Sequence, residues 1–134
     1  MKLSTNAAFL VLRLALGLIF IVHGFDKFAG GIENTAHFFE SIGISGGLAY
    51  VVATIELIGG ILMILGLGTR IVAALFIIVM LGAVFTVKSG TGFIGGYELD
   101  LALLGMSLAL LISGGGAISV EHQLFSKQSK EVQA

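Results

Sequence analysis

Four long apolar stretches constrain the fold of this chain more than any other feature of its sequence. Each approaches the roughly 20 residues that an α-helix needs to cross a hydrocarbon core of ~30 Å. We place these spans near residues 7–25, 47–65, 70–87 and 99–113. The sequence therefore predicts an all-α integral membrane protein: a four-helix transmembrane bundle within residues 1–120, followed by a polar, loosely ordered C-terminal tail at residues 121–134.

The composition excludes several other classes of protein. Only 11% of the 134 residues are charged and 57% are hydrophobic, whereas a soluble domain carries roughly 25% charged residues. The outer surface must therefore meet lipid. The absence of Cys excludes a disulfide, a thiolate nucleophile and a Cys-ligated iron–sulfur or zinc site. The net charge of −1 argues against a nucleic-acid partner.

The segment between the first two spans has a helical pattern of its own. Ile32, Thr35, Phe39 and Ile42 recur at helical spacing, and glycines flank the segment on both sides. This pattern predicts a short amphipathic helix over residues 32–42 that lies in the plane of the membrane interface.

The distribution of Lys and Arg predicts the orientation of the bundle. Lys2, Arg70, Lys127 and Lys130 fall on one side of the four spans, and Lys27 and Lys88 fall on the other. Cytoplasmic loops carry an excess of these residues, so both termini are expected in the cytoplasm.

Two charged residues lie within spans and require an explanation, because an unpaired charge costs several kcal/mol in lipid. Arg13 lies about two turns into the first span. Glu56 lies near the middle of the second, on a face with Ala53 and Gly60, and such small residues mark helix contacts. Since the two depths differ by about one turn (~5 Å), we predict an Arg13–Glu56 ion pair in the bundle core.

The fourth span opens with two acids on roughly opposite faces. Glu98 continues into Ala102 and Gly105, so we expect it to point inward, and we expect Asp100 to be lipid-exposed or interfacial. Glu98 lies at the non-cytoplasmic end, where His23, Lys27 and Lys88 also arrive. The sequence therefore predicts a polar pocket, with no metal site and no assigned catalytic group, formed by Arg13, His23, Lys27, Glu56, Lys88 and Glu98.

Each candidate also has a purely structural interpretation. A buried Arg13–Glu56 pair would lock the helix register. Lys27 and Lys88 would extend to the interface, and His23 would act as a hydrogen-bonding anchor. Haem ligation is disfavoured, because it requires His or Met at matched depth on facing helices.

Several short motifs together resemble those of the DoxX family. Each motif is common alone, but their order and spacing within a four-span layout are specific, and the resemblance runs from about Leu12 to Glu121. The motifs are Arg13-x-x-x-Gly17-x-x-Phe20, His23-Gly24-x-x-Lys27, Glu56-x-x-Gly59-Gly60, the Gly66-x-Gly68-Thr69-Arg70 turn, Glu98, and the Gly-rich segment before Ser119.

This resemblance implies a bacterial inner-membrane oxidoreductase, or the membrane subunit of a redox complex. DoxX proteins are associated with quinone-linked thiosulfate oxidation and with resistance to quinone, catechol and thiol-oxidative stress. A quinone is therefore the implied cofactor, and a soluble oxidoreductase is the implied partner. The chain departs from the family pattern at Gly43-Ile44-Ser45, which lacks the common Pro, and at Val120-Glu121, where Leu-Asp is usual. Neither change touches the charges within the spans.

Three functions remain open from the sequence. The first is a quinone-interacting redox protein, whose electrons must come from a bound cofactor or a partner because the chain has no Cys pair and no nucleotide motif. The second is a non-catalytic scaffold that anchors a soluble oxidoreductase. The third is a small transporter, since acids within spans also mark ion paths; one short bundle without inverted halves would then need a homo-oligomer to form a pore.

Overall fold

The computed structural model describes residues 2–134, with side chains from residue 4 onward, and every regular element in that range is helical. The elements are α1 (Lys2–Ala29), α2 (Ile32–Ser41), α3 (Gly47–Leu65), α4 (Thr69–Phe85), the short π-helical segment η1 (Phe93–Tyr97), α5 (Glu98–Ser113) and α6 (Val120–Gln133). Three stretches, Ser4–Ala29, Gly47–Leu65 and Phe93–Ser113, are long and apolar enough to cross a membrane, and α4 is a shorter apolar helix. The predicted four-helix membrane bundle is confirmed.

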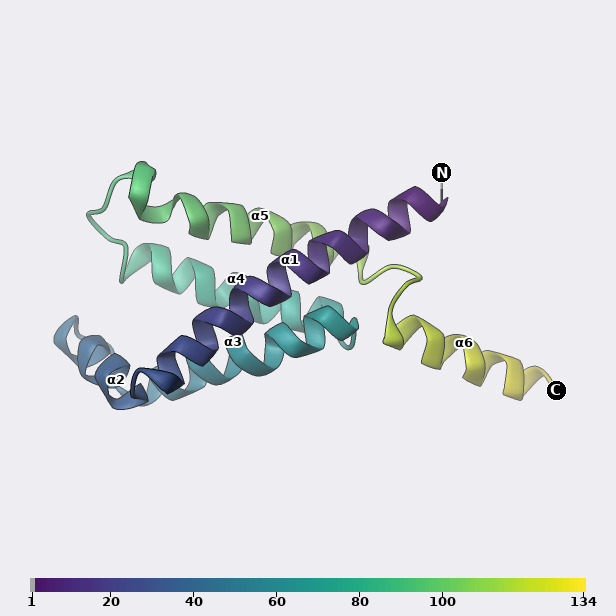
Figure 1. Cartoon of the computed structure of the whole chain (residues 1–134), viewed down its shortest axis with the longest axis horizontal. Helices are drawn as coiled ribbons and strands as arrows, with labels where there is room; N and C mark the ends of the chain where they lie inside the picture. The colour runs from purple at the N-terminus through teal and green to yellow at the C-terminus, as the bar shows by residue number, and fades with distance from the viewer. Residues whose placement is uncertain (1) are drawn as a thin grey trace.

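The four main helices run alternately up and down, which gives the bundle two distinct ends (Figure 1). The N-terminus, the α3–α4 turn and the start of α6 lie at one end, which we call the termini end. Helix α2 and the connection between α4 and α5 lie at the other, which we call the α2 end. The α1–α3 pair and the α4–α5 pair approach each other at the termini end and diverge toward the α2 end.

Glycines bring the backbones of α1 and α3 into direct contact. A Cβ atom added at Gly17 would lie 2.7 Å from the carbonyl oxygen of Gly60, and one added at Gly24 would lie 2.6 Å from the amide nitrogen of Leu57. No larger residue fits at either position without moving the backbones apart. Such close packing of small residues is a principal source of helix association in lipid.

The centre of the bundle is filled by apolar side chains from all four helices. The rings of Phe20 and Phe76 stack with centroids 3.7 Å apart, and Leu16, Met63 and Leu110 are completely buried around them. Large apolar side chains also cover the outer surface of the bundle, including Val11, Ile78 and Ile112. This outer layer suits contact with the lipid bilayer.

Helix α2 confirms the helix expected between the first two spans. It ends at Ser41, one residue before the predicted end. Its buried residues Ile32 and Phe39 form a small apolar cluster with Ala49 and Ala53 of α3. The location of α2 in the membrane interface stays a prediction.

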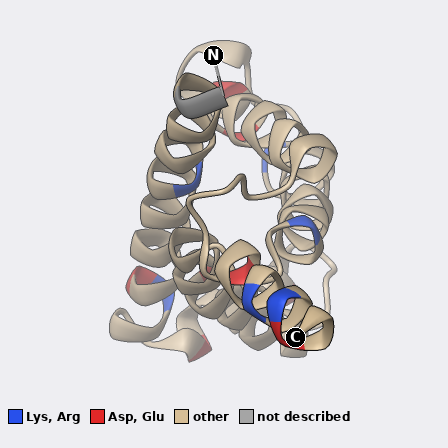
Figure 2. Ribbon diagram, turned by 90° about the vertical axis from the view of Figure 1, so that its right-hand side faces the viewer, with Lys and Arg blue, Asp and Glu red and all other residues tan. Residues whose placement is uncertain are grey.

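The C-terminal segment differs from the loosely ordered end that we expected. It forms the 14-residue helix α6, whose N-terminus is capped by the Ser119 hydroxyl accepting a hydrogen bond from the His122 amide at 3.2 Å. No residue of α6 is buried. The helix projects from the bundle and carries several charges, whereas most of the bundle ribbon carries none (Figure 2).

Candidate functional site

A cavity of about 550 Å³ lies at the α2 end, where the two helix pairs diverge. Its walls are mainly apolar and come from α1 to α5, with Phe20, Phe39, Ile55, Met80 and Leu103 among them. Its polar lining residues are His23, Lys27, Thr35, Glu56, Thr86, Lys88 and Asp100.

The cavity is open toward the outside of the bundle. Five of its large apolar lining residues are themselves exposed: Phe38 on α2, Leu48 and Val51 on α3, Ile78 on α4, and Leu99 on α5. These side chains belong to the apolar outer surface of the bundle that suits contact with lipid. The cavity therefore opens onto this apolar surface.

One wall carries an ion pair between α1 and α3. The Lys27 Nζ atom donates a hydrogen bond to Glu56 Oε2 at 2.7 Å. The Glu56 side chain is 5% exposed and the Lys27 side chain 23%. Lys27 lies one turn beyond Gly24, whose close contact with Leu57 brings this part of α1 to the level of Glu56.

This geometry corrects the predicted Arg13–Glu56 pair. Helix α1 extends past the end of α3, so Arg13 lies beside Gly66, just beyond the last residue of α3. Gly24 marks the level of Glu56, and it is separated from Arg13 by eleven residues, or roughly 16 Å of helix at 1.5 Å per residue. The prediction failed because it assumed that the first two spans begin and end at matching depths.

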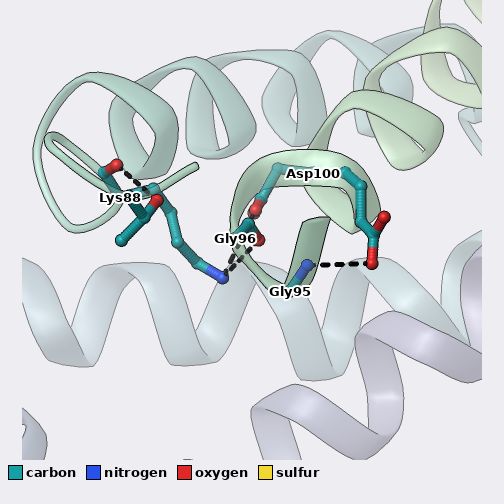
Figure 3. A network of polar contacts seen from close by, with 6 residues as sticks. Lys88, Gly95, Gly96 and Asp100 are labelled. Carbon is teal, nitrogen blue, oxygen red and sulfur yellow. Dashed lines mark hydrogen bonds and ion pairs between the residues drawn. The ribbon is translucent and has the colours of Figure 1, made fainter. Parts of the chain in front are cut away.

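The opposite wall carries a second pair, between Lys88 and Asp100. The Lys88 Nζ atom lies 3.6 Å from Asp100 Oδ2 and donates a hydrogen bond to the Gly96 carbonyl oxygen at 3.0 Å (Figure 3). Asp100 is buried and projects from the first turn of α5. The turn between Lys88 and Asp100 depends on Gly95, whose φ of 69° favours glycine.

The predicted orientations of the two α5 acids are reversed. Glu98 is exposed, accepts a hydrogen bond from the Gly95 amide at 3.2 Å and does not line the cavity. The buried face of α5 instead runs through Asp100, Leu103, Ser107 and Leu110. Small residues did not mark the contact face of this helix.

Arg13 is buried at the termini end, away from the cavity. Its side chain donates a hydrogen bond to the Ile118 carbonyl oxygen at 2.5 Å and packs directly against Gly66. The remaining guanidinium nitrogens, Nε and Nη1, have no hydrogen-bond partner among the described residues. Arg13 thus joins the segment before α6 to the end of α3.

Comparison with known proteins assigns this chain to a protein family. The profile of the DoxX family matches residues 8–89, which is more than half of the chain. The chain belongs to the DoxX family. The matched range contains α1 to α4 and therefore three of the four charged residues of the two ion pairs, with Asp100 outside it.

Relatives that align with most of the chain extend the family assignment beyond residue 89. The chain is 44% identical to "Putative oxidoreductase CatD" of Bacillus subtilis over 93% of this chain and 92% of the relative. It is 31% identical to "Inner membrane protein YphA" of Escherichia coli over 85% and 88% of the two chains. A membrane protein of Mycobacterium tuberculosis is 33% identical over 84% and 78%. No solved structure matches the chain.

The cavity of this DoxX protein therefore combines predicted and unpredicted residues. The structure brings His23, Lys27, Glu56 and Lys88 to it and leaves Arg13 and Glu98 outside. Asp100 was missed as a site residue. The signal that could have identified it is its spacing from Leu103, Ser107 and Leu110, which places it on the bulky apolar face of α5.

Proposed function

We propose that this DoxX protein is the quinone-binding membrane component of a redox system, and that the cavity at the α2 end holds the quinone ring. The observation that carries the proposal is the combination of apolar walls with two acid–base pairs on opposite sides of one cavity. Small-molecule sites typically have this character: a mostly apolar cleft of roughly 300–1,000 Å³ with a few polar groups that orient the ligand.

The lining residues suit the chemistry of such a ring. Phe20, Phe39 and Met80 offer apolar and aromatic surface to its faces. Lys27 and Lys88 offer N–H donors, and Glu56 and Asp100 offer acceptors, at separate points of the wall. A bound quinone supplies two-electron, two-proton chemistry, while the chain's own residues bind it, orient it and exchange protons with its oxygens.

The electrons must come from outside the described cavity residues. The chain contains no Cys, so it has no dithiol of its own. A bound cofactor or a soluble oxidoreductase partner must supply them. Helix α6, which has no buried residue and projects from the bundle, is available to contact such a partner.

We also propose a cytoplasmic-membrane location with both termini in the cytoplasm. The support comes from the name of the Escherichia coli relative as an inner membrane protein and from the excess of Lys and Arg at the termini end. A cysteine added after Ala134 should be labelled by an impermeant thiol reagent only in broken cells. Labelling in intact cells would contradict this orientation.

The binding proposal is tested by filling the cavity. Ile55 lines it, so Ile55→Trp should lower the affinity of the purified protein for a short-chain menaquinone analogue by at least about tenfold. Ile58→Trp is the matched control, because Ile58 is one turn away on the same helix, is 52% exposed and does not line the cavity. Equal binding by both variants, with both folded, would exclude the cavity as the site.

A scaffold without redox chemistry is the second candidate, and the projection of α6 from the bundle favours it. It predicts that a soluble oxidoreductase still copurifies with the Ile55→Trp variant and is lost when residues 120–134 are removed. Quinone binding by the wild-type protein, lost in Ile55→Trp, would favour the redox function instead.

A further inference from the structure

The two carboxylates of the cavity differ in how they are paired. Glu56 accepts a hydrogen bond from Lys27 at 2.7 Å, a normal distance for a charged donor and acceptor. Asp100 accepts no hydrogen bond from any described residue, and its buried Oδ2 atom has no hydrogen-bond donor among them. Its nearest cation, Lys88 Nζ, is 3.6 Å away, which is too far for a hydrogen bond.

The loop that carries Lys88 explains this separation. Lys88 Nζ is held by the Gly96 carbonyl oxygen at 3.0 Å. That carbonyl belongs to the turn at Gly95 and Gly96, whose Gly95 amide donates a hydrogen bond to Glu98 (Figure 3). The Tyr97 amide donates to the Gly92 carbonyl and closes the same turn. One of the three N–H groups of the ammonium is therefore engaged by the backbone, and Nζ stays short of the carboxylate.

A buried acceptor without a donor is unfavourable, by more than the gain from an ordinary hydrogen bond. A ligand that brings an O–H group to Asp100 removes this penalty. A ligand that brings a carbonyl oxygen does not, since two acceptors face each other. Lys27 does not provide a donor to Asp100, because it lies on the other wall of the cavity beside Glu56.

We propose that Asp100 accepts a hydrogen bond from a ring hydroxyl of the bound ligand, so that the cavity prefers the dihydroxy, reduced form of the ring over the dicarbonyl form. This inference rests on the proposed quinone-binding function and adds a specificity-determining residue to it. A hydrogen bond to a charged acceptor corresponds to a preference of about 10- to 100-fold. Each tenfold preference raises the two-electron potential of the bound ring by about 30 mV.

The test compares two redox states of one probe under anaerobic conditions. The affinities of 1,4-dihydroxynaphthalene and 1,4-naphthoquinone are measured with the detergent-purified full-length protein. The wild type should bind the dihydroxy form about 10- to 100-fold more tightly. Asp100→Asn, which keeps the size of the side chain, should lose most of this preference through weaker binding of the dihydroxy form. Asp26→Asn, the same change at an exposed aspartate of α1 that does not line the cavity, should retain it.

The outcomes separate this inference from the function on which it rests. If the wild type binds neither probe, the proposed quinone site is wrong and the inference fails with it. If it binds both equally, or the quinone more tightly, the site stands and the preference is wrong. If Asp100→Asn keeps the full preference, another group provides it. The wild-type comparison needs no variant, so the inference stays testable even where Asp100→Asn folds poorly.

Discussion

The two ends of this bundle accommodate buried charge in opposite ways. At the termini end, Arg13 is 1% exposed and packs against backbone, with the Ile118 carbonyl as its acceptor. At the α2 end, the two acid–base pairs Lys27–Glu56 and Lys88–Asp100 surround a cavity. Arg13 is enclosed by protein and does not line the cavity, whereas the four charged residues of these pairs do line it, within reach of a ligand. The comparison therefore separates residues that looked equivalent in sequence.

The contact between α1 and α3 supports both ends of the bundle. Disrupting it should therefore have the largest effect on the stability of the protein. In Gly60→Val, the added side chain would meet the Gly17 carbonyl oxygen at 2.7 Å and the Ile21 amide nitrogen at 2.9 Å. We expect a loss of about 3 kcal/mol in unfolding free energy or more, measured by thermal unfolding in detergent, together with loss of ligand binding.

Gly105→Val is the matched control for this substitution. A Cβ atom at Gly105 has no neighbour within 4 Å, so the variant should unfold within about 0.5 kcal/mol of the wild type. Equal stability of the two valine variants would show that the α1–α3 backbone contact is not required.

The termini end is tested alone by Arg13→Ala. This change leaves the Ile118 carbonyl without its donor and opens a space beside Gly66, so unfolding should become easier by about 2–3 kcal/mol. Affinity for the quinone analogue should stay within about twofold, because Arg13 does not line the cavity. Strong loss of affinity in a protein that remains folded would contradict the division between the two ends.

The α2 end is tested alone by Glu56→Gln, with the smallest expected effect on stability. The Lys27 side chain is already partly exposed and can turn toward water, so the loss should be about 1 kcal/mol. Affinity for the quinone analogue should fall by about tenfold, because Lys27 is no longer held at the cavity wall as a donor to a ring carbonyl. Glu33→Gln, at an exposed site on α2 outside the cavity, should change neither quantity.

The sequence predicted the helices well because long apolar runs leave a membrane chain few alternatives. Gly60 of α3 behaved as expected, since it does mark a contact face, where it meets Gly17 of α1. The same rule failed in α5, where Gly105 is open and bulky Leu103 and Leu110 make the contacts. Small residues mark an interface only where backbones touch.

The pairing of charges could not be predicted, because it depends on the register between helices. The apolar runs gave no sign that α1 extends beyond α3, and this offset moves Arg13 away from Glu56 and brings Lys27 to it. The cavity itself arises from the divergence of two helix pairs, which no single segment encodes. The local sequence therefore indicated most of the charged residues of the site, but it did not show which of them pair with one another.

The cavity opens at the side of the bundle, and this opening decides the units in which the affinity for a ligand should be expressed. Phe38, Leu48, Val51 and Ile78 are exposed at its edge, on the apolar outer surface of the bundle. If the ligand enters there from the bilayer, as the proposed function implies, it is drawn from a two-dimensional pool, and its relevant concentration is its mole fraction among the lipids. A dissociation constant expressed per litre of buffer would change with the amount of detergent, whereas one expressed per mole of lipid would not.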